Sequence, residues 1–103
     1  MIGRRRFGDV VDRQIDLFVR EHRGLIEDCL AAERAYNRAD RHEAEERYGD
    51  YADLVDLGTQ LLADMRDAYV RTLDEPEAEQ YAATFHEAVR RRLPRFALEL
   101  EDT

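Results

Sequence analysis

Three sets of apolar residues recur at alternating intervals of three and four residues, and together they span most of the chain. They cover residues 7–36, 44–73 and 78–100. Because an α-helix turns once every 3.6 residues, this spacing places each set along one helical face. The sequence therefore predicts an all-α protein made of three long antiparallel amphipathic helices in an up-down-up bundle.

Local signals mark the ends of the first two predicted helices. We expect the first helix to run from about Phe7 to Arg38 and the second to end near Leu73. Asp40, followed three residues later by Glu43, has the pattern of a capping box that starts the second helix. The short connection between them predicts an antiparallel hairpin.

The third predicted helix contains both prolines of the chain. It begins at residues 74–76, where two acids precede a proline suited to a first helical turn. Pro94 removes a backbone hydrogen bond within the third apolar set, so we expect this helix to kink or break near Pro94. The sequence indicates one domain, 1–103, with a flexible basic arm at 1–6 and a loose tail at 101–103.

Several features of the sequence indicate where in the cell the protein is located. No stretch approaches the ~20 apolar residues that cross a bilayer, and the N-terminal segment lacks the apolar region of a signal peptide. The single cysteine, Cys29, cannot form an internal disulfide, which suits a reducing compartment. We therefore expect a cytoplasmic protein without a membrane partner.

The residue types present exclude two kinds of catalysis. All sixteen basic residues are arginine, and serine is absent. A lysine Schiff base and a serine triad are thus impossible. No phosphate-binding loop, zinc spacing or Glu-x-x-His motif is visible. The sequence predicts no catalytic residue, cofactor or metal ligand, and so not an enzyme.

Negative charge is concentrated in the middle of the chain. The net charge is −8, and residues 40–80 hold thirteen acids against four arginines. This sign opposes nucleic-acid binding. Helical spacing places four carboxylates on one exposed face of the second helix, where they are predicted to bind a basic protein partner or simply to be solvated. These residues are Asp53, Asp56, Asp64 and Asp67.

Arginine is concentrated near the C-terminus. Arg90, Arg91, Arg92 and Arg95 form a basic cluster with few aromatic residues around it. We expect these arginines to pair with the acids of the second helix, in the same chain or a neighbouring one.

The first two helices carry more apolar surface than two neighbours in a small bundle usually cover. Their apolar arcs reach roughly 200°, whereas that of the third helix is nearer 120°. The third helix is also shorter. We therefore predict a homodimer formed through the first two helices. The residues outside the main apolar sets include Leu17, Leu30, Leu54, Leu57 and Leu61.

Two places remain as candidate ligand sites. Tyr36, Tyr48 and Tyr51, with His42 in the adjoining turn, gather at one end of the bundle as a possible pocket or interface. His22 lies on the apolar face of the first helix and is either a metal ligand or a core histidine. The leading hypothesis is a non-enzymatic, dimeric interaction or adaptor protein with an acidic second helix. The alternative is a ligand- or metal-binding bundle that uses the tyrosine end or His22.

Overall fold

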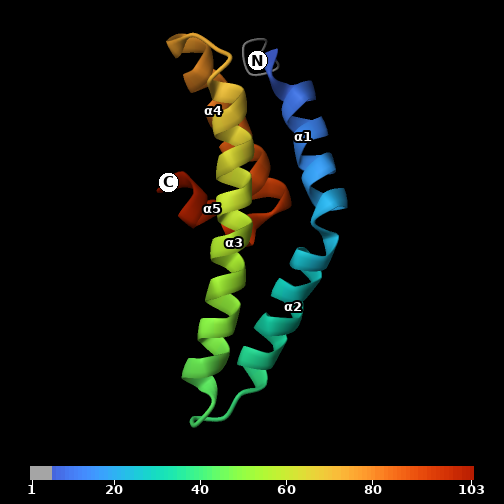
Figure 1. Ribbon diagram of the computed structural model, residues 1–103, viewed down its shortest axis with the longest axis vertical. Coiled ribbons are helices and arrows are strands. Elements are labelled where there is room, and N and C mark those ends of the chain that lie inside the picture. Colours follow the sequence, from blue (N-terminus) through green and yellow to red (C-terminus); the bar gives the residue numbers. More distant parts are fainter. Residues whose placement is uncertain (1–5) are drawn as a thin grey trace.

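The computed structural model describes residues 6–103, which fold into helices joined by short turns (Figure 1). The prediction of an all-α protein is confirmed for these residues, and the described chain contains five helices rather than the predicted three. The helices are α1 (Gly8–Glu21), α2 (Arg23–Arg38), α3 (Ala44–Val70), α4 (Glu75–Arg92) and α5 (Pro94–Glu101).

Two interruptions account for the difference in helix number. The first predicted helix is divided at His22, where the backbone leaves helical geometry at φ −118° and ψ 31°. The His22 ring packs 4.8 Å from the Phe18 ring, measured between centroids. The apolar spacing continues across this residue, so periodicity does not show the break. The third predicted helix is divided at Leu93, next to Pro94, which begins α5.

The turns also differ in part from the sequence prediction. The Asp40 side chain accepts a hydrogen bond from the Glu43 amide at 3.1 Å, as in a capping box, but residues 41–43 form a turn. The predicted helix start at Asp40 is therefore wrong, and α3 begins at Ala44. The start of α4 is as predicted, because the Asp74 side chain accepts from the Glu77 amide at 3.2 Å.

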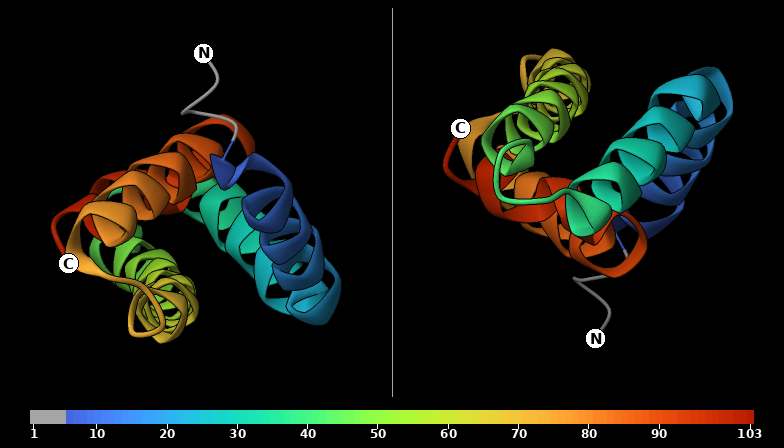
Figure 2. Two further views of the ribbon diagram at one scale, coloured as in Figure 1. Left: turned by 90° about the horizontal axis from the view of Figure 1, so that it is seen from above. Right: turned by 90° about the horizontal axis from the view of Figure 1, so that it is seen from below.

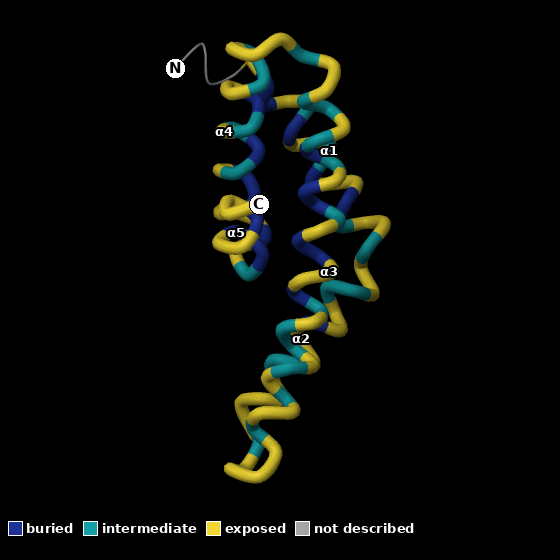
Figure 3. Tube along the Cα trace, turned by 60° about the vertical axis from the view of Figure 1, so that its left-hand side comes forward, coloured by how far each residue is buried: buried dark blue, intermediate teal, exposed yellow. Residues whose placement is uncertain are grey.

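The helices form an elongated molecule of 51 × 23 × 23 Å. α1 and α2 lead from one end to the other, α3 returns beside α2, and α4 runs back along the other half of α3 (Figure 1). Seen down the long axis, α3 and the α1–α2 pair diverge like the arms of a V, with α4 and α5 at its closed side (Figure 2). The end that holds the α2–α3 turn has few buried residues (Figure 3).

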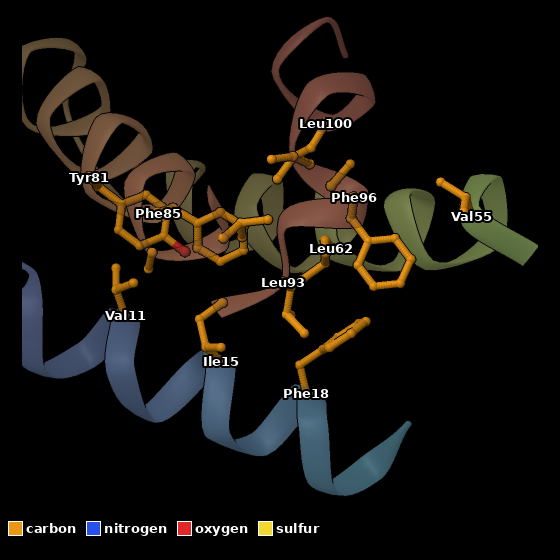
Figure 4. Packing of buried hydrophobic residues seen from close by; sticks show 14 of the residues in the cluster. Val11, Ile15, Phe18, Val55, Leu62, Tyr81, Phe85, Leu93, Phe96 and Leu100 are labelled. Carbon is orange, nitrogen blue, oxygen red and sulfur yellow. The ribbon is translucent and has the colours of Figure 1, made fainter. Parts of the chain in front are cut away.

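The core lies where α1, α3, α4 and α5 meet (Figure 4). α5 turns sharply away from α4 and crosses α3, so its apolar residues enter this core. At the crossing, an added Cβ on Gly58 would lie 2.8 Å from Cζ of Phe96, which shows how closely α5 approaches α3. Side chains with no exposed surface include Ile15, Phe18, Leu62, Tyr81, Phe85, Val89, Phe96 and Leu100.

The predicted terminal segments are only partly described. Residues 1–5 of the predicted arm lie outside the described residues. Arg6 forms an ion pair with Glu77. At the other end, Glu101 is the last residue of α5 and pairs with Arg90 at 2.7 Å.

Candidate interaction surfaces

The four predicted carboxylates all lie on α3, on one side that extends from about 90° to about 170° around the helix from the centre of its buried residues. Asp53, Asp56 and Asp64 are exposed, and Asp67 is half-buried. Their spacing of three, eight and three residues keeps them on one side of the helix. We call these four residues the acidic strip.

The C-terminal arginines do not pair with this strip. Arg90 pairs with Glu101, and Arg92 pairs with Asp16 at 2.7 Å. Arg91 lies 3.8 Å from Asp12, and Arg95 lies 3.4 Å from Glu33. The acids that they reach belong to α1, α2 and α5. The prediction that these arginines pair with acids of the second helix is therefore wrong within residues 6–103, because α4 and α5 turn their basic side chains toward α1, α2 and each other.

As a result, most of the acidic strip lacks a cationic neighbour. Asp67 accepts a hydrogen bond from Nε of Arg66 at 2.9 Å, and Asp64 accepts one from the Gln60 amide at 2.9 Å. Among the residues that the structure describes, no arginine pairs with Asp53, Asp56 or Asp64. α3 as a whole carries seven acids and two arginines. This strip is therefore a negatively charged surface open to solvent.

A second surface of α3 is apolar. Leu54, Leu57, Leu61, Met65 and Ala68 form a row about 130° around the helix from the centre of its buried residues, by the geometry of 100° per residue, and three of them are partly buried against the core. We call it the leucine row. Leu57 at its centre is 51% exposed.

On α1, Leu17 is 39% exposed. α1 packs mainly on α4, whereas α3 packs mainly on α2 and α5. The apolar excess inferred from the sequence is thus not fully buried within one chain.

The predicted tyrosine cluster is partly assembled. The rings of Tyr36 and Tyr48 meet edge to face with centroids 5.4 Å apart, and both side chains are exposed. Tyr51 is half-buried on the next turn of α3. His42 is exposed in the turn between α2 and α3. The end of the molecule therefore brings Tyr36 and Tyr48 together, while Tyr51 faces another neighbour, α5.

A pocket that the sequence did not reveal lies between α3 and α5. Its volume is about 370 Å³. The lining from α3 is Tyr48, Tyr51, Ala52, Val55 and Asp56, and that from α5 and the residue after it is Arg95, Leu98, Glu99 and Asp102. The sequence predicted a kink or break near Pro94 but not the direction that the chain takes after it. The pocket depends on that direction, because α5 turns across α3.

The candidate ligand His22 and the single cysteine, Cys29, both pack against other residues of the chain. His22 lies at the α1–α2 break against Phe18, and Cys29 is fully buried. Burial raises the pKa of the Cys29 thiol, and the nearby Arg95 only partly opposes this effect. Within residues 6–103, no group of three or more His, Cys, Asp or Glu side chains is placed to hold a metal ion.

A buried cation joins α3, α4 and α5. Arg66 is only 7% exposed, and its Nη1 donates to the Leu100 carbonyl at 3.3 Å and to Nε2 of His86 at 3.1 Å. Arginine can only donate, so His86 accepts through an unprotonated Nε2. Burial lowers the pKa of His86, and the positive charge of Arg66 lowers it further. This network holds the end of α5 against α3.

None of the helices in residues 6–103 combines the length and apolar character needed to cross a bilayer. A comparison of the chain with known protein families, curated proteins and solved structures finds no match.

Proposed function

We propose that the protein is a non-enzymatic interaction protein that works as a homodimer and presents the acidic strip of α3 to a basic protein partner in the cytoplasm. The observation that carries this proposal is the lack of arginine partners at Asp53, Asp56 and Asp64 within the described chain, although four arginines lie on α4 and α5. A row of unneutralised carboxylates on a rigid helix attracts a cationic surface over several ångströms.

The dimer part of the proposal rests on apolar surface. Leu17 and Leu57 lie on opposite arms of the V and remain exposed in the single chain. A second copy that covers such residues removes apolar surface from water, and each Å² buried in this way stabilises the dimer by about 25 cal/mol. The acidic strip lies beside the leucine row on α3, so it stays accessible at the edge of such an interface.

The tyrosine end is favoured over His22 as a place for binding. The pocket of about 370 Å³ contains Tyr48 and Tyr51, whereas His22 packs against a core phenylalanine. Metal binding at His22 has no supporting cluster among residues 6–103.

A labelled nine-residue peptide that repeats Gly-Ser-Arg three times tests the docking surface. We expect binding, measured by fluorescence anisotropy, to weaken at least tenfold between about 0.05 M and about 0.3 M NaCl, because salt screens exposed charges. Neutralising the strip by D53N, D56N, D64N and D67N together should weaken binding by about tenfold, roughly 1.4 kcal/mol. Circular dichroism should show unchanged helix content.

A matched control neutralises four exposed acids elsewhere. These substitutions are E21Q, E27Q, E79Q and E87Q, which change the net charge by the same amount. We expect the control to weaken binding by no more than about threefold, through the overall charge alone. Equal losses in the two variants, or binding that does not respond to salt, would show that the strip is not the docking surface.

A further inference from the structure

We propose that the pocket between α3 and α5 binds an arginine side chain of the basic protein partner. This inference rests on the proposed docking function and identifies the residue type that anchors the partner.

The pocket walls are two helix faces. On α3, Tyr48, Tyr51 and Val55 follow one another at intervals of three and four residues. The opposite wall is α5, where Leu98 is 82% exposed and stands at the edge of the pocket. Val55 is buried at the base. The pocket thus offers aromatic and aliphatic contacts to the apolar part of a long side chain.

The rim of the pocket is negatively charged. Asp56 from α3, Glu99 from α5 and Asp102, which directly follows α5, all line it. None of the three forms an ion pair with another residue in 6–103. The one cation in the lining, Arg95, is held by Glu33 at 3.4 Å. The unneutralised carboxylates therefore favour a positively charged occupant.

The carboxyl groups of Asp56 and Glu99 lie on opposite walls of the pocket, and Asp56 affects the pKa of Glu99. A hydrogen bond with Asp56 raises the pKa of Glu99, and partial burial and the like charge of Asp56 act in the same direction. A cation placed between these groups would remove the repulsion and favour both charged forms. The strip and the pocket share Asp56, so a partner lying along α3 reaches the pocket from the strip.

The lining favours arginine over a metal ion or lysine. Among the described residues, no cluster of carboxylates converges closely enough to hold a metal. A guanidinium is planar, stacks on tyrosine rings and donates to two carboxylates at once. A lysine ammonium is a compact, strongly hydrated charge that uses the aromatic walls less well. The pocket has both the tyrosine rings and the carboxylates that an arginine side chain contacts.

The pocket also remains open in the proposed dimer. Its α3 residues and the leucine row lie about 150° apart around the helix, by the geometry of 100° per residue. A second copy seated on the leucine row therefore leaves the pocket free.

Two peptides and two double variants of the full chain test the proposal. The probes are the Gly-Ser-Arg repeat and a Gly-Ser-Lys repeat of equal length and charge. We expect the intact protein to bind the arginine peptide at least threefold more tightly, as expected for one cation–π contact of about 0.7 kcal/mol. D56N with E99Q should abolish this preference. D53N with D64N, which removes the same charge outside the pocket, should weaken both peptides equally and keep the preference.

Y48L provides a second measurement that leaves the charge unchanged. We expect it to weaken the arginine peptide by about threefold and the lysine peptide by less, so that the preference for arginine shrinks. If both peptides bind equally well, or if both double variants keep the preference, the pocket proposal is overturned while the docking function stands. If neither peptide binds the intact protein, the docking function fails, and the pocket proposal fails with it.

Discussion

At the scale of single residues, the close approach of α5 to α3 depends on the absence of a side chain at Gly58. A Cβ at this position would overlap the ring of Phe96, which is fully buried and packs edge to face against Phe18 with ring centroids 6.4 Å apart. A Cβ at position 58 therefore requires this buried ring to shift, and the close packing accounts for a glycine here although glycine is a poor helix former.

Gly58→Ala should destabilise the protein by up to about 2 kcal/mol in urea unfolding. Overpacking costs about 1–3 kcal/mol and outweighs the gain of about 1 kcal/mol in helix propensity. Gly49→Ala in the same helix is the control, because an added Cβ there meets nothing within 4 Å. That variant should be stabilised by about 0.5–1 kcal/mol. Equal stabilisation of both variants would show that Phe96 does not pack on Gly58.

At the scale of helices, α5 is held by the Arg66 network, and this network responds to pH. His86 accepts from Arg66 only while it is neutral. Its surroundings also include Arg90, which lowers its pKa, and Glu101, which raises it, but burial and Arg66 are the dominant influences. The pKa of His86 is consequently lower in the folded protein than in the unfolded chain.

His86→Gln should make the protein less sensitive to mild acid. Because the unfolded chain binds the histidine proton more readily, the free energy of unfolding falls as the pH drops below the ordinary histidine pKa of about 6.5. It stops falling below the folded pKa. Glutamine keeps a hydrogen-bond acceptor but does not titrate, so the variant should lose less stability between about pH 7.5 and 5.5, measured by thermal unfolding.

The exposed His42 supplies the comparison for this measurement. H42Q lies in the turn before α3 and should follow the pH dependence of the unmodified protein. If H86Q and the unmodified protein lose equal stability over this range, protonation of His86 does not release α5.

The helices also show what the sequence could predict. The apolar spacing and the signals at Asp74 and Pro76 located the helical regions and the start of α4. The break at His22 was missed because the same apolar period continues through it. The acidic strip was found because it depends on helical spacing alone. The pocket was missed because it depends on the direction that α5 takes after Pro94, which no local pattern specifies.

At the scale of the whole molecule, the leucine row and the acidic strip are neighbours on α3, and this arrangement makes a specific prediction for the homodimer. Joining two leucine rows brings two negatively charged helices together. The dimer is then favoured by buried apolar surface and opposed by charge repulsion, which salt screens. The dissociation constant of the dimer should therefore fall as NaCl rises from about 0.05 M to about 0.3 M, the opposite of the response expected for the basic peptide.

Light scattering after size exclusion tests this arrangement directly. The chain has a mass of 12.1 kDa, and the intact protein at micromolar concentration should elute with twice that mass. Leu57→Arg places a charge at the centre of the leucine row and should yield the mass of a single chain. Leu98→Arg makes the same chemical change at the more exposed leucine of α5 and should leave the dimer intact. A single-chain mass for the intact protein at both salt concentrations would mean that the exposed leucines serve another contact.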